Sequence, residues 1–241
     1  MAEPLHPLLP FALALGLAGL LGLELVREVG WEALTAKEAH DPTLGTLGAL
    51  PTRRADGDAL LLLGNSRAGF AMQEPRTLPQ VTTAAGMDAQ AYLVFGPELA
   101  ASTLAKEQWK LVAWHPTVVV MQIDLLLPLG PKGRYADPVG RLMSYQRRGP
   151  EAEAGLTLLG RLWWARRVVL EVPMGRTLAM RLGDAWWVER RQIHAALRAR
   201  GLEVIADEQP WPDALFLDGL HFSVEGAFAF RRWLGQRLGG G

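Results

Sequence analysis

The chain has 241 residues, about half of them hydrophobic (49%), and equal numbers of basic and acidic side chains give a formal net charge of zero. A balanced charge provides no global attraction to nucleic acid, and no nucleic-acid-binding motif is present, so we expect no nucleic-acid partner. The absence of cysteine excludes disulfides, thiolate catalysis and cysteine-ligated metal sites. The length fits one domain of ordinary to large size with an extension.

Residues 1–26 are predicted to form a transmembrane anchor. Leu8 to Leu23 is an uninterrupted run of apolar residues and glycine. A helix from Leu5 to Val26 would be about 33 Å long, enough to cross a hydrocarbon core of about 30 Å. The residues before the run contain no Lys or Arg, and no small-x-small cleavage site follows it. An uncleaved anchor is therefore favoured over a cleaved signal peptide or a buried helix, and the bilayer is an expected partner.

Residues 27–56 are predicted to be a stem, because Ala, Thr, Gly and Pro with scattered charges show no sustained period. Residues 57–241 are predicted to form the functional domain. Its strand-length apolar runs are Ala59–Leu63, Thr117–Ile123, Arg167–Val172, Leu202–Ala206 and a fifth near Val81. Helical spacing marks Leu93–Leu111, Ala185–Arg200 and a last helix capped by Ser223 and running to about Leu238. This alternation predicts an α/β fold, a flavodoxin-like three-layer α/β/α sandwich with a parallel sheet.

Gly130 to Arg161 is the least regular stretch of the predicted domain and contains three prolines. Long irregular loops after a strand often cover an active site. The stretch is a candidate lid, and a solvated excursion is the alternative.

The segment Leu61-Leu62-Leu63-Gly64-Asn65-Ser66-Arg67 is predicted to be a buried strand that runs into a tight turn carrying a serine. The Ser66 hydroxyl would then lie at the carboxyl end of a sheet, where open α/β folds bind ligands. Read alone, Gly-Asn-Ser is an ordinary turn sequence.

A second segment, Leu217-Asp218-Gly219-Leu220-His221-Phe222, lies about 150 residues later. It places a carboxylate three residues before a histidine on a glycine-containing turn. This spacing lets the Asp218 carboxylate fix the tautomer of the His221 imidazole and stabilise its charged form. The two segments together offer a nucleophile, a base and an orienting acid.

Together the two segments resemble the SGNH (GDSL-type) hydrolase superfamily, which carries a Gly-x-Ser block near the start of its domain and an Asp-x-x-His block near its end. The resemblance spans roughly residues 57–238 and points to the membrane-anchored branch that modifies envelope polysaccharides. It implies Ser66 as the nucleophile, His221 as the general base and Asp218 as the residue that orients His221. It also implies an oxyanion hole that includes the Ser66 and Gly86 backbone N–H groups.

The third block of the resembled family usually carries an Asn after the third strand, and the window Val118–Leu126 contains none. Gln122 could donate a side-chain N–H to an oxyanion, whereas an ionised Asp124 could only accept, so Gln122 is assigned to the oxyanion hole. Arg67 is a candidate for binding a substrate anion, with pairing to an acid beneath the turn as the alternative, and Asn65 is a second candidate for substrate binding.

The resemblance implies a serine esterase or O-acyltransferase that acts on small, acetyl-like esters of an envelope glycan through an acyl-serine, with a glycan or ester as substrate. We expect no cofactor. The alternative is a catalytically inactive, membrane-tethered scaffold or partner of a polysaccharide modification or export complex. In either case an integral-membrane acyltransferase or export protein is a candidate partner.

The expected location is the bacterial inner membrane, with a single span and the domain in the periplasm or outside the cell. This orientation follows the resemblance, because charge counting alone, with Arg27, Lys37, Arg53 and Arg54 after the predicted span, favours a cytoplasmic domain.

The remaining aromatic and histidine residues carry no clear catalytic pattern. No two of the other histidines have a metal-ligand spacing, so we predict no metal site. The doublets Trp163-Trp164 and Trp186-Trp187 lie near basic residues. Such tryptophans stack on sugars, lie at a membrane surface or pack in the core.

Overall fold

A computed structural model of the chain describes residues 44–45, 50, 56–72, 77–96, 99, 101–126 and 150–240. They belong to one compact unit, Pro42–Gly241. The predicted anchor, residues 1–26, and nearly all of the predicted stem, residues 27–56, lie outside the described residues. Among the helices that are described, none is both long and apolar enough to span a bilayer.

The centre of the fold is a sheet of six parallel strands in the order β1-β3-β2-β4-β5-β6. The strands are β1 (Leu44–Gly45), β2 (Asp58–Gly64), β3 (Ala89–Phe95), β4 (Val118–Gln122), β5 (Arg166–Leu170) and β6 (Glu203–Ile205). Without the two-residue edge strand β1, this is the 2-1-3-4-5 order of flavodoxin-like folds. The predicted α/β fold with a parallel sheet is confirmed.

The strands read as continuous apolar runs because helices cover both faces of the sheet, as parallel sheets require. Leu60 and Leu62 of β2 face one core cluster, and Leu61 and Leu63 face the other. All five residues of β4 are buried. The predicted strands at residues 59–63, 117–123, 167–172 and 202–206 correspond to β2, β4, β5 and β6.

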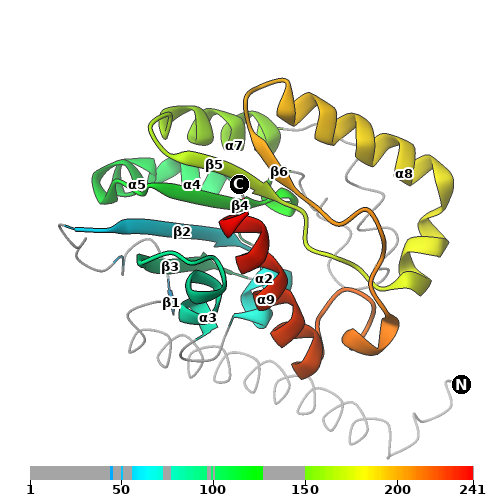
Figure 1. Ribbon diagram of the computed structural model, residues 1–241. Coiled ribbons are helices and arrows are strands. Elements are labelled where there is room, and N and C mark those ends of the chain that lie inside the picture. The colour runs from blue at the N-terminus through cyan, green and yellow to red at the C-terminus, as the bar shows by residue number, and fades with distance from the viewer. Residues whose placement is uncertain are drawn as a thin grey trace, which may run out of the picture. The chain divides into compact units, whose positions relative to one another are not determined.

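Two groups of helices complete the layers (Figure 1). One face is covered by α2 (Ser66–Ala71), α3 (Thr77–Ala84) and α9 (Val224–Gly239). The other is covered by α4 (Ala101–Lys106), α5 (Gln108–Trp114), α7 (Pro150–Arg161) and the end of α8 (Arg176–Arg198). Short 3-10 turns, η2 (Ile123–Leu125) and η4 (Asp213–Leu215), follow β4 and precede the loop that carries His221.

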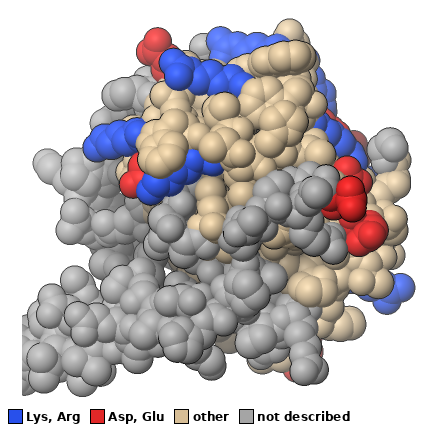
Figure 2. Space-filling view, turned by 90° about the vertical axis from the view of Figure 1, so that its left-hand side faces the viewer, with Lys and Arg blue, Asp and Glu red and all other residues tan. Residues whose placement is uncertain are grey.

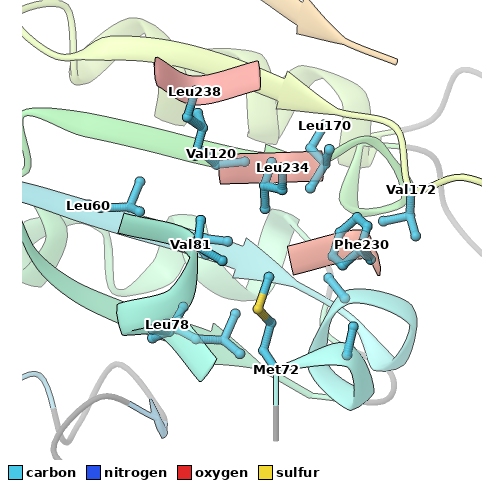
Figure 3. Packing of buried hydrophobic residues seen from close by; sticks show 14 of the residues in the cluster. Leu60, Met72, Leu78, Val81, Val120, Leu170, Val172, Phe230, Leu234 and Leu238 are labelled. Atoms are coloured by element: carbon cyan, nitrogen blue, oxygen red, sulfur yellow. The ribbon is translucent and has the colours of Figure 1, made fainter. Parts of the chain in front are cut away.

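Helix α9 anchors the carboxyl end of the chain on the sheet. Ser223 caps it by accepting a hydrogen bond from the Gly226 N–H at 3.2 Å, as predicted. Phe230, Leu234 and Leu238 of α9 lie over Leu60, Val120 and Leu170 of the sheet, beside Leu78 and Val81 of α3 (Figure 3).

The region between β2 and β4 differs from the prediction. The prediction of a strand near Val81 is wrong, because these residues form the helix α3. The strand between β2 and β4 is β3 (Ala89–Phe95), and it overlaps the first residues of the helix that was expected from Leu93. A short buried apolar run has no period that separates a strand from a helix segment. The end of the candidate lid also differs, since residues 150–161 form the helix α7, whereas the rest of that stretch lies outside the described residues.

The contact between α3 and α9 depends on a glycine. A Cβ atom at Gly235 would lie 2.5 Å from the Ala84 Cβ and 2.6 Å from the Val81 carbonyl oxygen. We predict that Gly235→Ala lowers the free energy of unfolding by about 1–3 kcal/mol through overpacking. Gly160→Ala is the control, because a Cβ there meets nothing within 4 Å, and alanine should stabilise α7 by about 0.5–1 kcal/mol. Chemical denaturation measures the free energy of unfolding of both variants, and equal changes in the two would contradict the prediction.

Candidate active site

Ser66 is the first residue of α2, directly after the turn that ends β2. Asn65 caps this helix, because its side-chain Oδ1 accepts from the Arg67 N–H at 3.1 Å. The helix packs closely on β3 because a Cβ at Gly69 would lie 2.3 Å from the Phe95 ring. These contacts fix the Ser66 side chain at the carboxyl edge of the sheet, as the sequence predicts.

His221 lies in a loop that the aromatic core holds at both ends. Phe216 and Phe222 form an isolated antiparallel bridge, and their rings stack with centroids 5.0 Å apart. Phe222 stacks in turn on Phe230 of α9 at 4.9 Å. Gly219 has a φ of +83°, a left-handed conformation that favours glycine. The loop therefore folds over on itself, with Leu220 buried and Asp218 exposed at its tip.

The structure brings Ser66, His221 and Asp218 together. The Ser66 Oγ lies 3.3 Å from the His221 Nε2, and the His221 Nδ1 lies 2.7 Å from the Asp218 Oδ2. The other carboxylate oxygen accepts from the Leu220 and His221 N–H groups at 2.9 and 2.7 Å. The side chains of His221 and Asp218 are 24% and 45% exposed, so the arrangement is open to solvent. This is the order of contacts expected of a nucleophile, a base and its orienting acid, whose roles in catalysis stay a prediction.

The environment of Asp218 favours its ionised form. Partial burial raises the pKa of this carboxyl, but hydrogen bonds from the His221 N–H and ring and from the Leu220 N–H outweigh that effect and hold the pKa of Asp218 below its ordinary value of 3.8. The charged carboxylate is thus available to fix the imidazole.

Beneath Ser66 lies a buried polar network of Asn65, Arg67, Gln122 and Asp124, each at most 7% exposed. The Arg67 guanidinium pairs with the Asp124 carboxylate at 3.1 Å. The same guanidinium donates to the Val172 and Pro173 carbonyls at 2.7 and 3.1 Å. The network therefore joins the ends of β2, β4 and β5.

The Gln122 amide joins the same network to the turn before Ser66. Its Oε1 accepts from the Asn65 N–H at 2.9 Å, and its Nε2 donates to the Asn65 Oδ1 at 2.8 Å and to Asp124. A primary amide has two N–H hydrogens, and these two contacts use both. The expectation that Gln122 donates to an oxyanion is therefore corrected, since this side chain holds Asn65 in place.

The two candidates for substrate binding also have structural partners. Arg67 is the buried partner of an acid beneath the turn, the alternative that the sequence left open, and is no free group for a substrate anion. The Asn65 Oδ1 is committed to the Arg67 N–H and the Gln122 amide. Both residues shape the turn that carries Ser66.

Gly86 lies at the wrong edge of the sheet for an oxyanion hole. Its N–H donates to the Thr83 carbonyl at 3.0 Å, and it precedes the start of β3, which pairs in parallel with β2. Ser66 follows the other end of β2, seven residues away along the strand, or about 20 Å. The error follows from the misplaced strand near Val81. The glycine that follows β3 is Gly96, whose N–H lies 3.4 Å from the Gly64 carbonyl oxygen.

No group of three or more His, Asp or Glu side chains among the described residues is arranged to hold a metal ion. The candidate site instead offers a hydroxyl, an imidazole and a carboxylate in a hydrogen-bonded row.

No family model matches the chain, and no curated protein matches its sequence. Solved structures do match its fold. The periplasmic domain of a lipopolysaccharide acetyltransferase from Salmonella ser. Paratyphi A is 10% identical, with a TM-score of 0.51 over 89% of this chain and 95% of that domain. At this identity the likeness concerns the fold alone.

Two further enzymes are similar at lower scores. LAE5, an alpha/beta hydrolase from the metagenome of Lake Arreo, is 14% identical, with a TM-score of 0.48 over 78% of this chain and 99% of that chain. The psychrotrophic esterase EstA from Pseudoalteromonas sp. is 13% identical, with a TM-score of 0.47 over 73% of this chain and 94% of that chain.

The depressed pKa of Asp218 predicts a pH-dependent contribution to stability. Because the folded-state pKa lies below 3.8, the ionised carboxylate stabilises the fold above that pH, and the contribution disappears as the pH falls through the folded-state pKa. Asp218→Asn cannot ionise. We expect wild type to be more stable than the variant at about pH 5, and the difference to shrink toward about pH 2. Chemical denaturation across this range measures the difference, and a constant one would contradict the prediction.

The Arg67–Asp124 pair predicts a non-additive effect of substitution. Arg67→Met leaves a buried carboxylate without its cation, and should lower the free energy of unfolding by about 3–5 kcal/mol. Arg67→Met with Asp124→Leu should cost less than Arg67→Met alone, because no unpaired charge then remains. The half-buried pair of Lys110 and Glu107 at the surface, 2.7 Å apart, provides the control, since Lys110→Met should cost less than about 1 kcal/mol. Additive losses in the double variant would refute the account.

Proposed function

We propose that the protein is a serine-dependent acyl-transfer enzyme, an esterase or O-acyltransferase. The observation that carries this proposal is the contact of Ser66 with His221 at 3.3 Å, together with the contact of His221 with Asp218 at 2.7 Å. Ser66 and His221 are 155 residues apart in the chain, so no local turn explains their contact.

In the proposed reaction, His221 Nε2 takes the proton of the Ser66 hydroxyl as the Ser66 oxygen attacks an ester carbonyl. Asp218 holds the other ring nitrogen and stabilises the imidazolium that forms. His221 then returns the proton to the leaving alcohol, and the acyl group remains on Ser66. Water or a sugar hydroxyl, deprotonated by the same His221, releases the acyl group, and this second nucleophile distinguishes an esterase from a transferase.

The oxyanion of the tetrahedral intermediate needs N–H donors. Ser66 opens α2, and the first N–H groups of a helix have no acceptor within the helix, so its own N–H is one donor. Gly96 follows the neighbouring strand β3 at the same edge, and its N–H would have to leave the Gly64 carbonyl, 3.4 Å away, to act as a second donor. The Gln122 amide and Gly86 are not available. Loss of one donor typically slows catalysis by about 100- to 1,000-fold, so we expect a slow enzyme if Ser66 acts alone.

The proposed substrate is a small, acetyl-like ester of an envelope glycan, and the proposed location is the bacterial inner membrane with the domain outside the cytoplasm. The family resemblance of the Ser66 and His221 segments supports both. The fold shared with the periplasmic domain of a lipopolysaccharide acetyltransferase is compatible with them.

A fluorophosphonate probe tests the proposal without knowledge of the natural substrate. The full-length protein should become covalently labelled, because an activated serine attacks phosphorus as it would an ester carbonyl. Ser66→Ala and His221→Ala should lower the labelling rate by about 1,000-fold or more. Ser102→Ala, which removes a different serine hydroxyl, on α4, is the matched control and should label as wild type does.

An unlabelled but folded wild type would instead support the inactive scaffold, tethered to a polysaccharide modification or export complex. Labelling that survives Ser66→Ala would exclude this serine as the nucleophile. Once labelling is established, release of acetate or its transfer to a sugar decides between esterase and transferase.

A further inference from the structure

The edge where the strands begin, opposite Ser66, carries a tryptophan that packing does not explain. Trp163, in the turn between α7 and β5, is 74% exposed. Its neighbour Trp164 packs, since its Nε1 donates to the Pro116 carbonyl at 3.0 Å and its ring stacks on His115 with centroids 4.8 Å apart. Core packing therefore accounts for one residue of the doublet and leaves the other in solvent.

Four arginines lie on the segments that meet at this edge of the sheet. Arg161 ends α7, Arg198 ends α8, Arg200 lies two residues further along the chain, and Arg167 lies at the start of β5. The Arg167 guanidinium donates to the Gly201 carbonyl at 3.5 Å, which links the start of β5 to the end of α8. We call Trp163 with these four arginines the Trp163 surface.

The acids closest in sequence to this edge are partly engaged elsewhere. Glu203 of β6 pairs with Arg166, at 2.8 Å. Within the part of the chain that the structure describes, no ion pair joins the other four arginines to an Asp or Glu. Figure 2 views this edge and shows Lys and Arg gathered in its upper part, the level at which α7 and the end of α8 lie in Figure 1. The acidic Asp56, Asp58 and Asp88 belong to the starts of β2 and β3.

We propose that the Trp163 surface contacts the anionic phospholipid headgroups of a bilayer. Guanidinium groups only donate hydrogen bonds, and their geometry matches phosphate oxygens. An indole is stable at the depth of the headgroups, where its apolar ring contacts acyl chains and its N–H contacts water. Each basic residue near an anionic leaflet strengthens binding by about fivefold. A neutral sugar, by contrast, has no charge for these arginines to bind.

This contact would set the direction in which the domain faces. The Trp163 surface lies where β5 begins, and the carboxyl edge with Ser66 and His221 lies at the other end of the strands, about 20 Å away. The candidate active site would then open away from the bilayer and toward substrates in the surrounding solution.

The test uses the full chain, whose lack of cysteine allows a single introduced label. Gly160→Cys lies beside the Trp163 surface at a position where a Cβ meets nothing within 4 Å. Val224→Cys, at an 80% exposed position at the start of α9, is the control at the other edge. A polarity-sensitive fluorophore on each is measured with vesicles of phosphatidylcholine alone and with vesicles that contain phosphatidylglycerol.

With phosphatidylglycerol vesicles, we expect the label at position 160 to shift to the blue and to be shielded from iodide, and the label at 224 to remain in water. Phosphatidylcholine alone should leave both labels in water. Equal responses at the two positions, or no response at 160, would overturn the proposal.

Two triple variants with the same change in net charge distinguish the effect of this surface from the effect of net charge. Arg161, Arg198 and Arg200 changed together to Gln should weaken the lipid-dependent response at 160 by about 100-fold in lipid concentration. The control changes three exposed arginines on the other part of α8 to Gln, namely Arg176, Arg181 and Arg191. It removes the same charge and should weaken the response at 160 by less than about fivefold. Equal losses in the two triple variants would refute a specific surface. Trp163→Ala should also weaken the response.

Discussion

The ion pair between Arg67 and Asp124 is the constraint on which the candidate site depends. Burying two charges costs desolvation, which good pair geometry and further hydrogen bonds to both groups offset. Here the guanidinium donates to Asp124 and to two backbone carbonyls after β5, and the carboxylate also accepts from Gln122. Three strand ends are thereby fixed to one side chain that directly follows Ser66 in the chain.

The other half of the site is held by apolar contacts. Phe216 and Phe222 bring the ends of the loop together and stack into the core through Phe230 of α9. Gly219 supplies the one left-handed conformation that the tip needs. Ser66 and His221 therefore approach one another from two separately stabilised frames. A separation of 3.3 Å between hydroxyl and imidazole is at the loose end of hydrogen bonding, as catalytic contacts often are before substrate binds.

The sequence predicts the parts of this fold whose signals are local. Buried apolar runs predict β2, β4, β5 and β6, and Ser223 predicts the start of α9. The strand β3 is not predicted, because a short apolar run fits a helix equally well. This one error assigns the expected oxyanion glycine to the opposite edge of the sheet. The roles of Gln122 and Arg67 depend on the pairing of β2 with β4, whose contacts join residues 57 positions apart. No local pattern contains that information.

At the end of β4, where the resembled family carries an Asn, this chain carries Gln122 and Asp124, and both are engaged in holding the turn of Ser66. In the proposed mechanism, one network would then both hold the Ser66 turn rigid and leave the oxyanion with fewer N–H donors. A missing donor raises the barriers to acylation and deacylation alike, because both pass through a tetrahedral oxyanion. The balance between hydrolysis and transfer is then decided by which nucleophile reaches the acyl group. With His221 and Asp218 24% and 45% exposed, water competes unless a sugar hydroxyl is already bound, so acceptor binding is the property that would make this site a transferase.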